Sequence, residues 1–244
     1  MLEPHSPHQA VHTWKDVFIH IAIIAVGLLI AIGLEQTVEF FHHRHQRHVL
    51  LGAIRRECED NVQILTTHLD VNIPNMLWYR RVLAEVRSAP VVGGNVEIVV
   101  PAKDPAAPQR VMFAPERDVA PAARAAGELS LLTEEEAQAF SVLDFQAEED
   151  QKEVDLIRAA SARLARWELE TGQKVVAGGT LRLTADQRKD LAEALAYECQ
   201  QLFDLLRRDN LFLVDTQRWL AGDYSVSQFV RKNTVGPIRI DQYR

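Results

Sequence analysis

One apolar stretch decides the fold of this chain, and it reads VFIHIAIIAVGLLIAIGL from Val17 to Leu34. It contains no Asp, Glu, Lys or Arg, and His20 is its one ionisable side chain. As a helix rising about 1.5 Å per residue it is roughly 27 Å long, close to the ~30 Å hydrocarbon thickness of a bilayer. Trp14 precedes it at the position of an interfacial aromatic residue. We therefore predict one N-terminal transmembrane helix over residues 14–35, with the lipid bilayer as a partner.

Three other kinds of segment resemble a span: a cleaved signal peptide, a buried core helix and an interfacial amphipathic helix. A signal peptide has a basic N-terminal region and a cleavage site of small residues, whereas residues 1–14 contain no Lys or Arg. A helix of a soluble protein and an interfacial helix both present a polar face to water, and residues 17–34 have no such face. The sequence therefore favours a span.

The charges that flank the span favour a cytoplasmic main domain, because cytoplasmic flanks carry an excess of Lys and Arg. Lys15 precedes the span, whereas Arg44 and Arg47 follow it. The opposite orientation stays open, because long domains cross membranes largely regardless of charge. Cys58 and Cys199 fit a reducing compartment, and the sequence alone leaves a disulfide between them open.

The rest of the chain has the composition of a folded domain. About 200 residues remain after the span, enough for one domain with a hydrophobic core. The chain is 47% hydrophobic and 25% charged, near the averages of globular proteins, so we expect it to fold. A net charge of −7 and the lack of a basic stripe argue against a nucleic-acid partner.

The periodicity after the span predicts a mainly α fold. Apolar residues recur every three or four positions over residues 50–69, so the transmembrane helix is expected to continue into the soluble domain. Asn72, Pro74 and Asn75 are expected to break or kink this helix, and a second helix is predicted from about Asn75 to Arg87.

Two capping boxes predict two further long helices. They are Thr133 with Glu136 and Thr184 with Gln187, and the helices are expected to end at Gly172 and at Gly222. Long helices joined by few connections indicate an antiparallel helical bundle.

A proline-rich segment interrupts the helical pattern between Ser88 and Pro121. This density of proline excludes a continuous helix and predicts a loop. Two short β-prone runs, Val96–Val100 and Arg110–Phe113, are expected to pair as a small hairpin inside this loop. The predicted organisation is a disordered tail (1–13), a transmembrane helix (14–35), a helical bundle domain (36–222, with a loop or hairpin insertion at 88–121) and a C-terminal tail (223–244).

A histidine cluster directly after the span is the best candidate for chemistry. On a helix, His42, His45 and His48 share one face, and such imidazoles bind zinc or another divalent metal. The alternative is a juxtamembrane collar in which imidazole and guanidinium groups contact lipid headgroups. No catalytic or cofactor-binding residue and no cofactor is predicted, because no nucleophile, phosphate-loop, dinucleotide or His-Glu-x-x-His motif occurs.

Four short segments resemble the start of a group of uncharacterised bacterial single-pass, membrane-anchored helical proteins. A fifth segment, Ala120–Ser141 with Ala125–Leu129 before a capped helix, resembles a later part of the same group. The resemblance implies a bacterial inner-membrane protein, and it implies no activity and no catalytic residue. The first four segments are Trp14–His20, Gly27–Ala31, Leu34–Gln36 and His42–Arg44.

Two functions are therefore expected to compete. The first is a non-enzymatic membrane protein whose bundle docks a protein partner or senses a ligand, with a homodimer along Gln36–Leu69. Ala25, Gly27 and Gly33 would allow two such helices to approach closely within the membrane. The alternative is a metal-binding protein or metal-dependent membrane enzyme that uses the three histidines of the juxtamembrane cluster.

Overall fold

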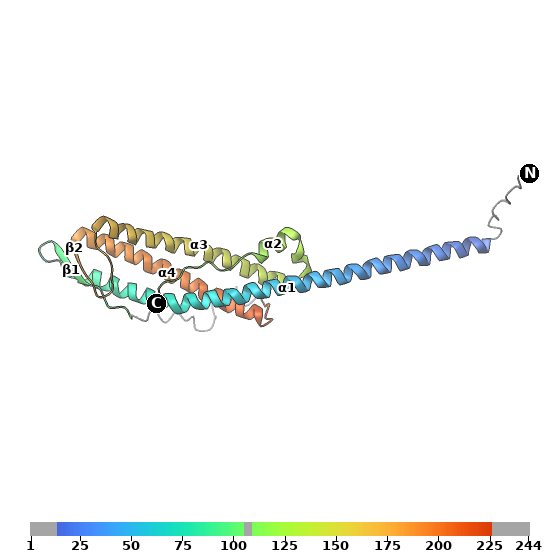
Figure 1. Ribbon diagram of the computed structural model, residues 1–244, viewed down its shortest axis with the longest axis horizontal. Coiled ribbons are helices and arrows are strands. Elements are labelled where there is room, and N and C mark those ends of the chain that lie inside the picture. The colour runs from blue at the N-terminus through green and yellow to red at the C-terminus, as the bar shows by residue number, and fades with distance from the viewer. Residues whose placement is uncertain (1–13, 105–108, 226–244) are drawn as a thin grey trace, which may run out of the picture. The chain divides into compact units, whose positions relative to one another are not determined.

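The computed structural model describes residues 14–104 and 109–225, and it confirms a mainly helical fold (Figure 1). The tail predicted for residues 1–13 and residues 226–244 of the predicted C-terminal tail lie outside the described residues. The chain forms two compact units, Met1–Val49 and Leu50–Arg244. In chain order the elements are α1 (Trp14–Ser88), β1 (Asn95–Val99), α2 (Val119–Ala126), the short 3₁₀ helix η1 (Glu128–Leu131), α3 (Glu134–Thr171), β2 (Thr180–Thr184) and α4 (Ala185–Leu220).

The described part of the first unit is the N-terminal portion of α1, residues 14–49. Its large apolar side chains are exposed, for example Ile24 at 70% and Leu29 at 68%. Among the described residues, α1 is the one helix long and apolar enough to cross a membrane. Its length and composition make it a candidate for a membrane anchor or a signal sequence, because both classes of segment meet these criteria.

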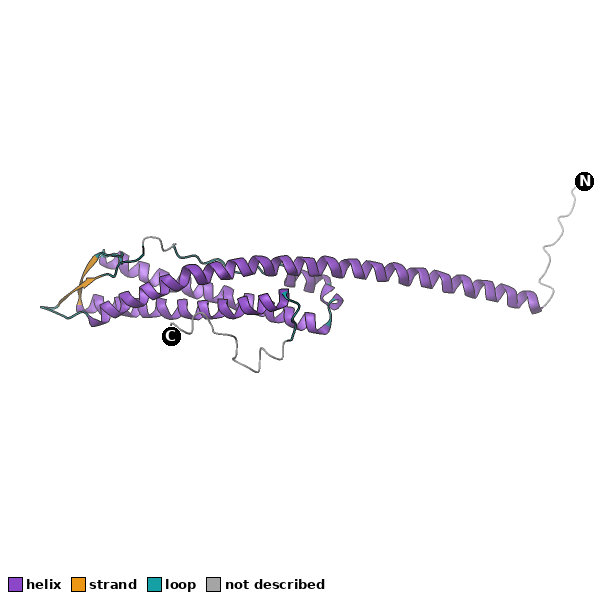
Figure 2. Ribbon diagram, turned by 90° about the horizontal axis from the view of Figure 1, so that it is seen from below, coloured by secondary structure: helices purple, strands orange, loops and turns teal. Residues whose placement is uncertain are grey.

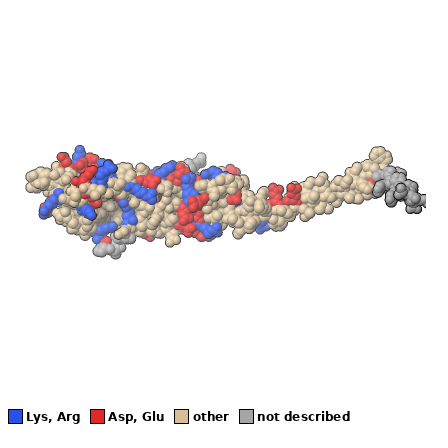
Figure 3. Space-filling model, turned by 45° about the horizontal axis from the view of Figure 1, so that its top comes forward, with Lys and Arg blue, Asp and Glu red and all other residues tan. Residues whose placement is uncertain are grey.

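The second unit is a helical bundle whose first buried side chain is Leu50. Residues 50–88 of α1 lie beside α3 and α4 in two views at right angles (Figures 1 and 2). Leu65, Ile157 and Leu206, one from each of these helices, are completely buried in the shared core. Charged side chains of both signs are interspersed over the surface of this unit (Figure 3).

The three long helices do not simply alternate in direction. Trp78, Trp167 and Leu191 lie in one apolar cluster, so the end of α1, the end of α3 and the start of α4 meet. The helix α4 is therefore antiparallel to both others, as predicted, whereas α1 and α3 run in the same direction. The physical reason is the long segment between α1 and α2, which returns the chain along the bundle before α3 begins.

Of the break or kink expected at Asn72, Pro74 and Asn75, the break does not occur, and the second helix expected from about Asn75 to Arg87 is the end of α1. Pro74 lies inside α1, which continues without interruption to Ser88. Proline removes one backbone N–H and weakens a helix locally. Next to it, the Asn75 side chain donates a hydrogen bond to the Val71 carbonyl (2.7 Å), and Asn72, Asn75 and Met76 are buried against the rest of the bundle. Tertiary packing around Pro74 therefore outweighs the local signal.

The expected hairpin inside the proline-rich segment is also wrong. The strand β1 forms, but its antiparallel partner is β2, with Val96 opposite Leu183 and Ile98 opposite Leu181. These four side chains are at most 2% exposed and close the apolar cluster at this end of the bundle. Burial of one apolar face on each strand favours this long-range pair over a local hairpin.

The two predicted capping boxes are confirmed. Thr133 accepts a hydrogen bond from the Glu136 amide at the start of α3, and Thr184 accepts one from the Gln187 amide at the start of α4. In each box the side chain three residues later bonds back to the amide of the capping threonine. Gly172 ends α3 in the left-handed conformation, at φ 67°.

Candidate functional site

The segment that returns along the bundle is held by polar side chains of α1. We call residues 100–118 the strap, of which 105–108 lie outside the described residues. Asn61 donates to the Glu116 carbonyl (2.9 Å) and accepts from the Glu116 amide (2.7 Å). Asn72 pairs in the same way with Val111, at 2.8 and 3.3 Å. Each asparagine thus satisfies both backbone groups of one strap residue, as a neighbouring strand would.

Both ends of the strap are bonded to α1 as well. The Glu57 carboxylate accepts from the Asp118 and Val119 amides at the start of α2, both at 2.8 Å. Burial raises the pKa of Glu57 above its usual value, although these two hydrogen bonds oppose the shift. At the other end the Trp78 indole donates to the Pro101 carbonyl (2.9 Å). The strap therefore runs antiparallel to α1 along most of the bundle.

A buried histidine joins α1, α4 and the strap. Nδ1 of His68 lies 3.2 Å from Oδ2 of Asp209, and both side chains are 0% exposed. On the opposite side of the ring, the Phe113 amide donates to Nε2 of His68 (3.1 Å). Because Nε2 accepts a hydrogen bond, the ring proton belongs on Nδ1, and the neutral imidazole donates to Asp209.

A second buried carboxyl lies close to this pair. Asp150 of α3 is 1% exposed, and burial followed by the charge of Asp209 raises its pKa to about 9. Asp150 is therefore protonated at neutral pH. Burial also raises the pKa of Asp209, opposed by the hydrogen bond from His68. Oδ2 of Asp150 and Oδ1 of Asp209 have no hydrogen-bond partner among the described residues. We call His68, Asp150 and Asp209 the buried acid centre.

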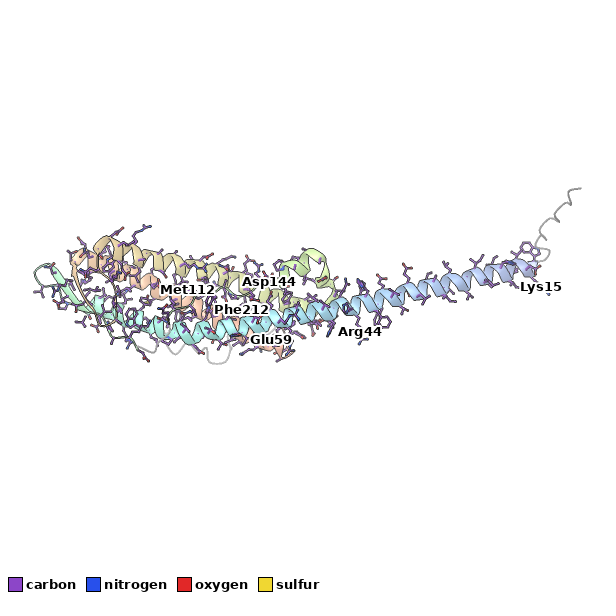
Figure 4. All side chains as sticks on the ribbon, viewed as in Figure 1. Lys15, Arg44, Glu59, Met112, Asp144 and Phe212 are labelled. Atoms are coloured by element: carbon purple, nitrogen blue, oxygen red, sulfur yellow. The ribbon has the colours of Figure 1, made fainter. Side chains whose placement is uncertain are left out.

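Arginines of the strap and of α2 form two further polar contacts with the bundle. Arg110 pairs with the fully buried Glu198 of α4 and donates to the Ser161 hydroxyl of α3 (2.5 Å). Arg117 and Arg124 both bind the carboxylate of Asp144, which Figure 4 labels, at 2.6 and 2.9 Å. Burial alone would raise the pKa of Asp144, but the hydrogen bonds from the two arginines lower it. The strap is thus tied to all three long helices.

A groove between α1 and α4 combines several cationic side chains with apolar ones. It encloses about 560 Å³ and carries Arg80 and Arg87 from α1 and Arg207 from α4, which we call the arginine groove. Its apolar lining residues include Leu83 and Phe203.

Both cysteines are free and buried, so the structure contains no disulfide between Cys58 and Cys199. Burial raises the pKa of Cys58 to about 12 and that of Cys199 to about 11, so neither is a thiolate at neutral pH. Trp78, Trp167 and Trp219 are each 5% exposed and are core residues.

The metal site predicted at His42, His45 and His48 stays a prediction. The three side chains are exposed on α1, in the stretch where Figure 4 labels Arg44. Within residues 14–104 and 109–225, no group of three or more His, Cys, Asp or Glu side chains is arranged to bind a metal ion. A closed site would need further ligands, for example from a second molecule.

Sequence analysis did not identify the buried acid centre or the asparagines that hold the strap. One signal was available, because polar residues occupy core positions of amphipathic helices there. His68 lies between Leu65 and Leu69, and Asp209 lies between Leu206 and Phe212. A polar residue on an apolar stripe needs a buried partner, and the pattern does not name that partner.

Comparisons with known proteins do not place the chain in a family. No family model matches it, and neither a curated protein nor a solved structure matches it. The resemblance to bacterial membrane-anchored proteins therefore stays a prediction.

Proposed function

We propose that this chain is a single-pass protein of the bacterial inner membrane whose helical bundle docks a protein partner or senses a ligand. The observation that carries the proposal is α1, a single helix that contains both the exposed apolar residues 17–34 and the buried bundle residues from Leu50 to Val86. Small shifts of one packed helix are a common means of passing a binding event along a protein. A helix shared by an anchor and a bundle suits that role.

The polar groups of the bundle support binding over catalysis. A catalytic group must contact its substrate, and His68, Asp150 and Asp209 are at most 1% exposed. Arg110 and Glu198 neutralise each other inside the bundle. The exposed polar groups of the arginine groove are suited to hold a ligand.

The main domain is proposed to lie in the cytoplasm. Arg44, Arg47, Arg55 and Arg56 follow the apolar stretch, and cationic residues near a membrane surface favour the cytoplasmic leaflet by about 1 kcal/mol each. A reporter that is active only outside the cytoplasm, fused after Arg244, should therefore stay inactive. Strong activity of that fusion would contradict the proposed side.

Membrane extraction of the full chain tests the anchor. The unmodified chain should stay with the membrane after an alkaline carbonate wash, at its full length. Leu28→Arg with Leu29→Arg should release it, because each charge near the centre of a span costs about 2.5–3.5 kcal/mol. The matched control is Phe40→Arg with Phe41→Arg, which adds the same charge at exposed positions beyond the apolar stretch. Release of the unmodified chain, or its cleavage after the apolar stretch, would overturn the proposal.

A further inference from the structure

Two side chains of the arginine groove, Arg87 and Arg207, carry positive charge that no described residue neutralises. Arg87 and Arg207 form no hydrogen bond or ion pair with any residue in the described ranges 14–104 and 109–225, although they come from two different helices and line the same groove. Asp204 is the one acid among the lining residues, and it accepts a hydrogen bond from Gln200 (2.7 Å). In a chain of net charge −7, the groove is therefore a local site of positive potential.

The electrostatic environment of the neighbouring Cys199 thiol supports a positive potential in the groove. Cys199 lines the groove, and its pKa is raised mainly by burial and by Glu198. Arg80 and Arg87 act in the opposite direction, since their positive charges favour the thiolate. Both guanidinium groups of α1 are thus close enough to act on a group in the groove.

The groove also offers an apolar surface beside the arginines. Leu83 is 8% exposed and Phe203 is half-buried, so both present apolar surface to the groove, whereas Met76 beneath them is fully buried. Its volume of about 560 Å³ lies in the range of about 300–1,000 Å³ that is typical of small-molecule sites. A ligand that fills it would present both an anionic and an apolar part.

We propose that the arginine groove binds a small soluble organic anion. Its carboxylate or phosphate would be held by the guanidinium groups of Arg87 and Arg207, and its apolar part would lie on Leu83 and Phe203. Guanidinium groups bind both kinds of anion through paired, charge-assisted hydrogen bonds. This assigns a ligand class to the sensing role proposed above, and it rests on that role.

Calorimetric titration of the full chain in phosphatidylcholine nanodiscs tests the site with three probes: hexyl phosphate, inorganic phosphate and hexanol. Hexyl phosphate should bind saturably at one site, inorganic phosphate about tenfold more weakly, and hexanol not measurably. Arg87→Gln and Arg207→Gln should each lower the affinity for hexyl phosphate about tenfold or more, because each substitution removes a charge-assisted hydrogen bond. The matched controls are Arg81→Gln and Arg166→Gln, exposed arginines outside the groove. Their affinity should stay within about twofold.

Three results would overturn the ligand assignment. The first is equal affinity of the groove variants and the unmodified chain, and the second is hexanol binding as tightly as hexyl phosphate. The third is competition by phosphatidylglycerol built into the nanodisc, which would assign the groove to a lipid headgroup. The carbonate extraction measures only membrane insertion, independently of ligand binding. A chain that inserts into the membrane but binds no hexyl phosphate would therefore refute the proposed ligand site and leave the proposed membrane anchor standing.

Discussion

Nδ1 of His68 on α1 lies 3.2 Å from Oδ2 of Asp209 on α4, and no solvent reaches either side chain. The opposite ring nitrogen of His68 accepts a hydrogen bond from the Phe113 amide of the strap. One imidazole therefore joins three segments that are far apart in the sequence. Without the imidazole, Oδ2 of the buried Asp209 would lose this partner.

Replacing this imidazole should be strongly destabilising. His68→Ala leaves the Asp209 carboxyl buried without its partner, and breaking a buried pair in this way costs about 3–5 kcal/mol of unfolding free energy. Urea unfolding of the full chain, followed by tryptophan fluorescence, measures the loss. Thr67→Ala changes an exposed neighbour and should stay within about 0.5 kcal/mol of the unmodified chain. A similar loss in both variants would show that the pair contributes nothing specific.

The asparagines of α1 should control the order of the strap. Asn72→Ala removes both hydrogen bonds to Val111 and is expected to lower the unfolding free energy by about 1–3 kcal/mol. Hydrogen exchange of the Val111 amide should accelerate, because that amide loses its acceptor. Gln63→Ala, an exposed change on the same helix, is the control. Unchanged exchange at Val111 in the Asn72 variant would contradict the assigned role.

Asp150 should make the protein less stable as the pH rises. The folded chain keeps its proton up to a pKa of about 9, whereas the unfolded chain releases it near the usual value of 3.8. Between these pH values the folded state binds more protons, so its stability falls by up to about 1.4 kcal/mol per pH unit. Asp150→Asn removes this titration and should stabilise the protein at pH 8, with a smaller gain at pH 5.

Urea unfolding at several pH values between 5 and 8 measures the slope for Asp150. The control is Asp155→Asn on the same helix, whose side chain is 63% exposed and should leave the slope unchanged. Identical slopes for Asp150→Asn and the unmodified chain would show that the Asp150 proton is not retained on folding.

The juxtamembrane histidines make a separate prediction about metal. If His42, His45 and His48 bind zinc, the full chain purified in detergent should carry it stoichiometrically, and the triple alanine variant should lose it. His43→Ala, which changes an exposed imidazole on another face, should retain the metal. Elemental analysis of the unmodified chain, the triple alanine variant and His43→Ala measures the bound zinc. Equal, substoichiometric zinc in all three would exclude the site and favour the lipid-headgroup collar.

Beyond Val49 the apolar stripe of α1 packs inside the bundle of one chain, so we expect a homodimer along α1 to use residues 36–49. Leu50, Ile54 and Leu65 are buried within the bundle of one chain, so they are not available to a second copy. Single cysteines introduced over residues 36–49 should crosslink in the membrane with a helical period of about 3.6 residues. Cys58 and Cys199 should not interfere, because both are buried and protonated. Crosslinking without any period would count against a specific dimer.

Local sequence signals predicted the helical character of α1 and the starts of α3 and α4, but not the short helix α2. The capping boxes at Thr133 and Thr184 each involve residues three positions apart, so their chemistry is complete within one turn of chain. The apolar stretch from Val17 to Leu34 is equally local. These features need no knowledge of the rest of the fold.

Such local signals did not predict which distant segments pair with each other. The strand β1 had an apolar alternation that predicted a strand, but a local partner and β2 satisfied that pattern equally well. Pro74 predicted a break, because the sequence does not reveal that Asn72, Asn75 and Met76 are buried around it. The arginine groove combines α1 and α4, and its residues show no motif in either helix.

By itself, the sequence determined the helical class, the apolar N-terminal segment and the starts of α3 and α4, because each depends on side chains within about one helical turn. Only the tertiary structure decided which strand pairs with β1, which buried polar groups face each other, and where Arg87 and Arg207 converge. His68 and Asp209 are 141 positions apart in the chain. Such partners are chosen by the closing of the whole core, because a buried polar group is stable only where the fold brings a partner to it.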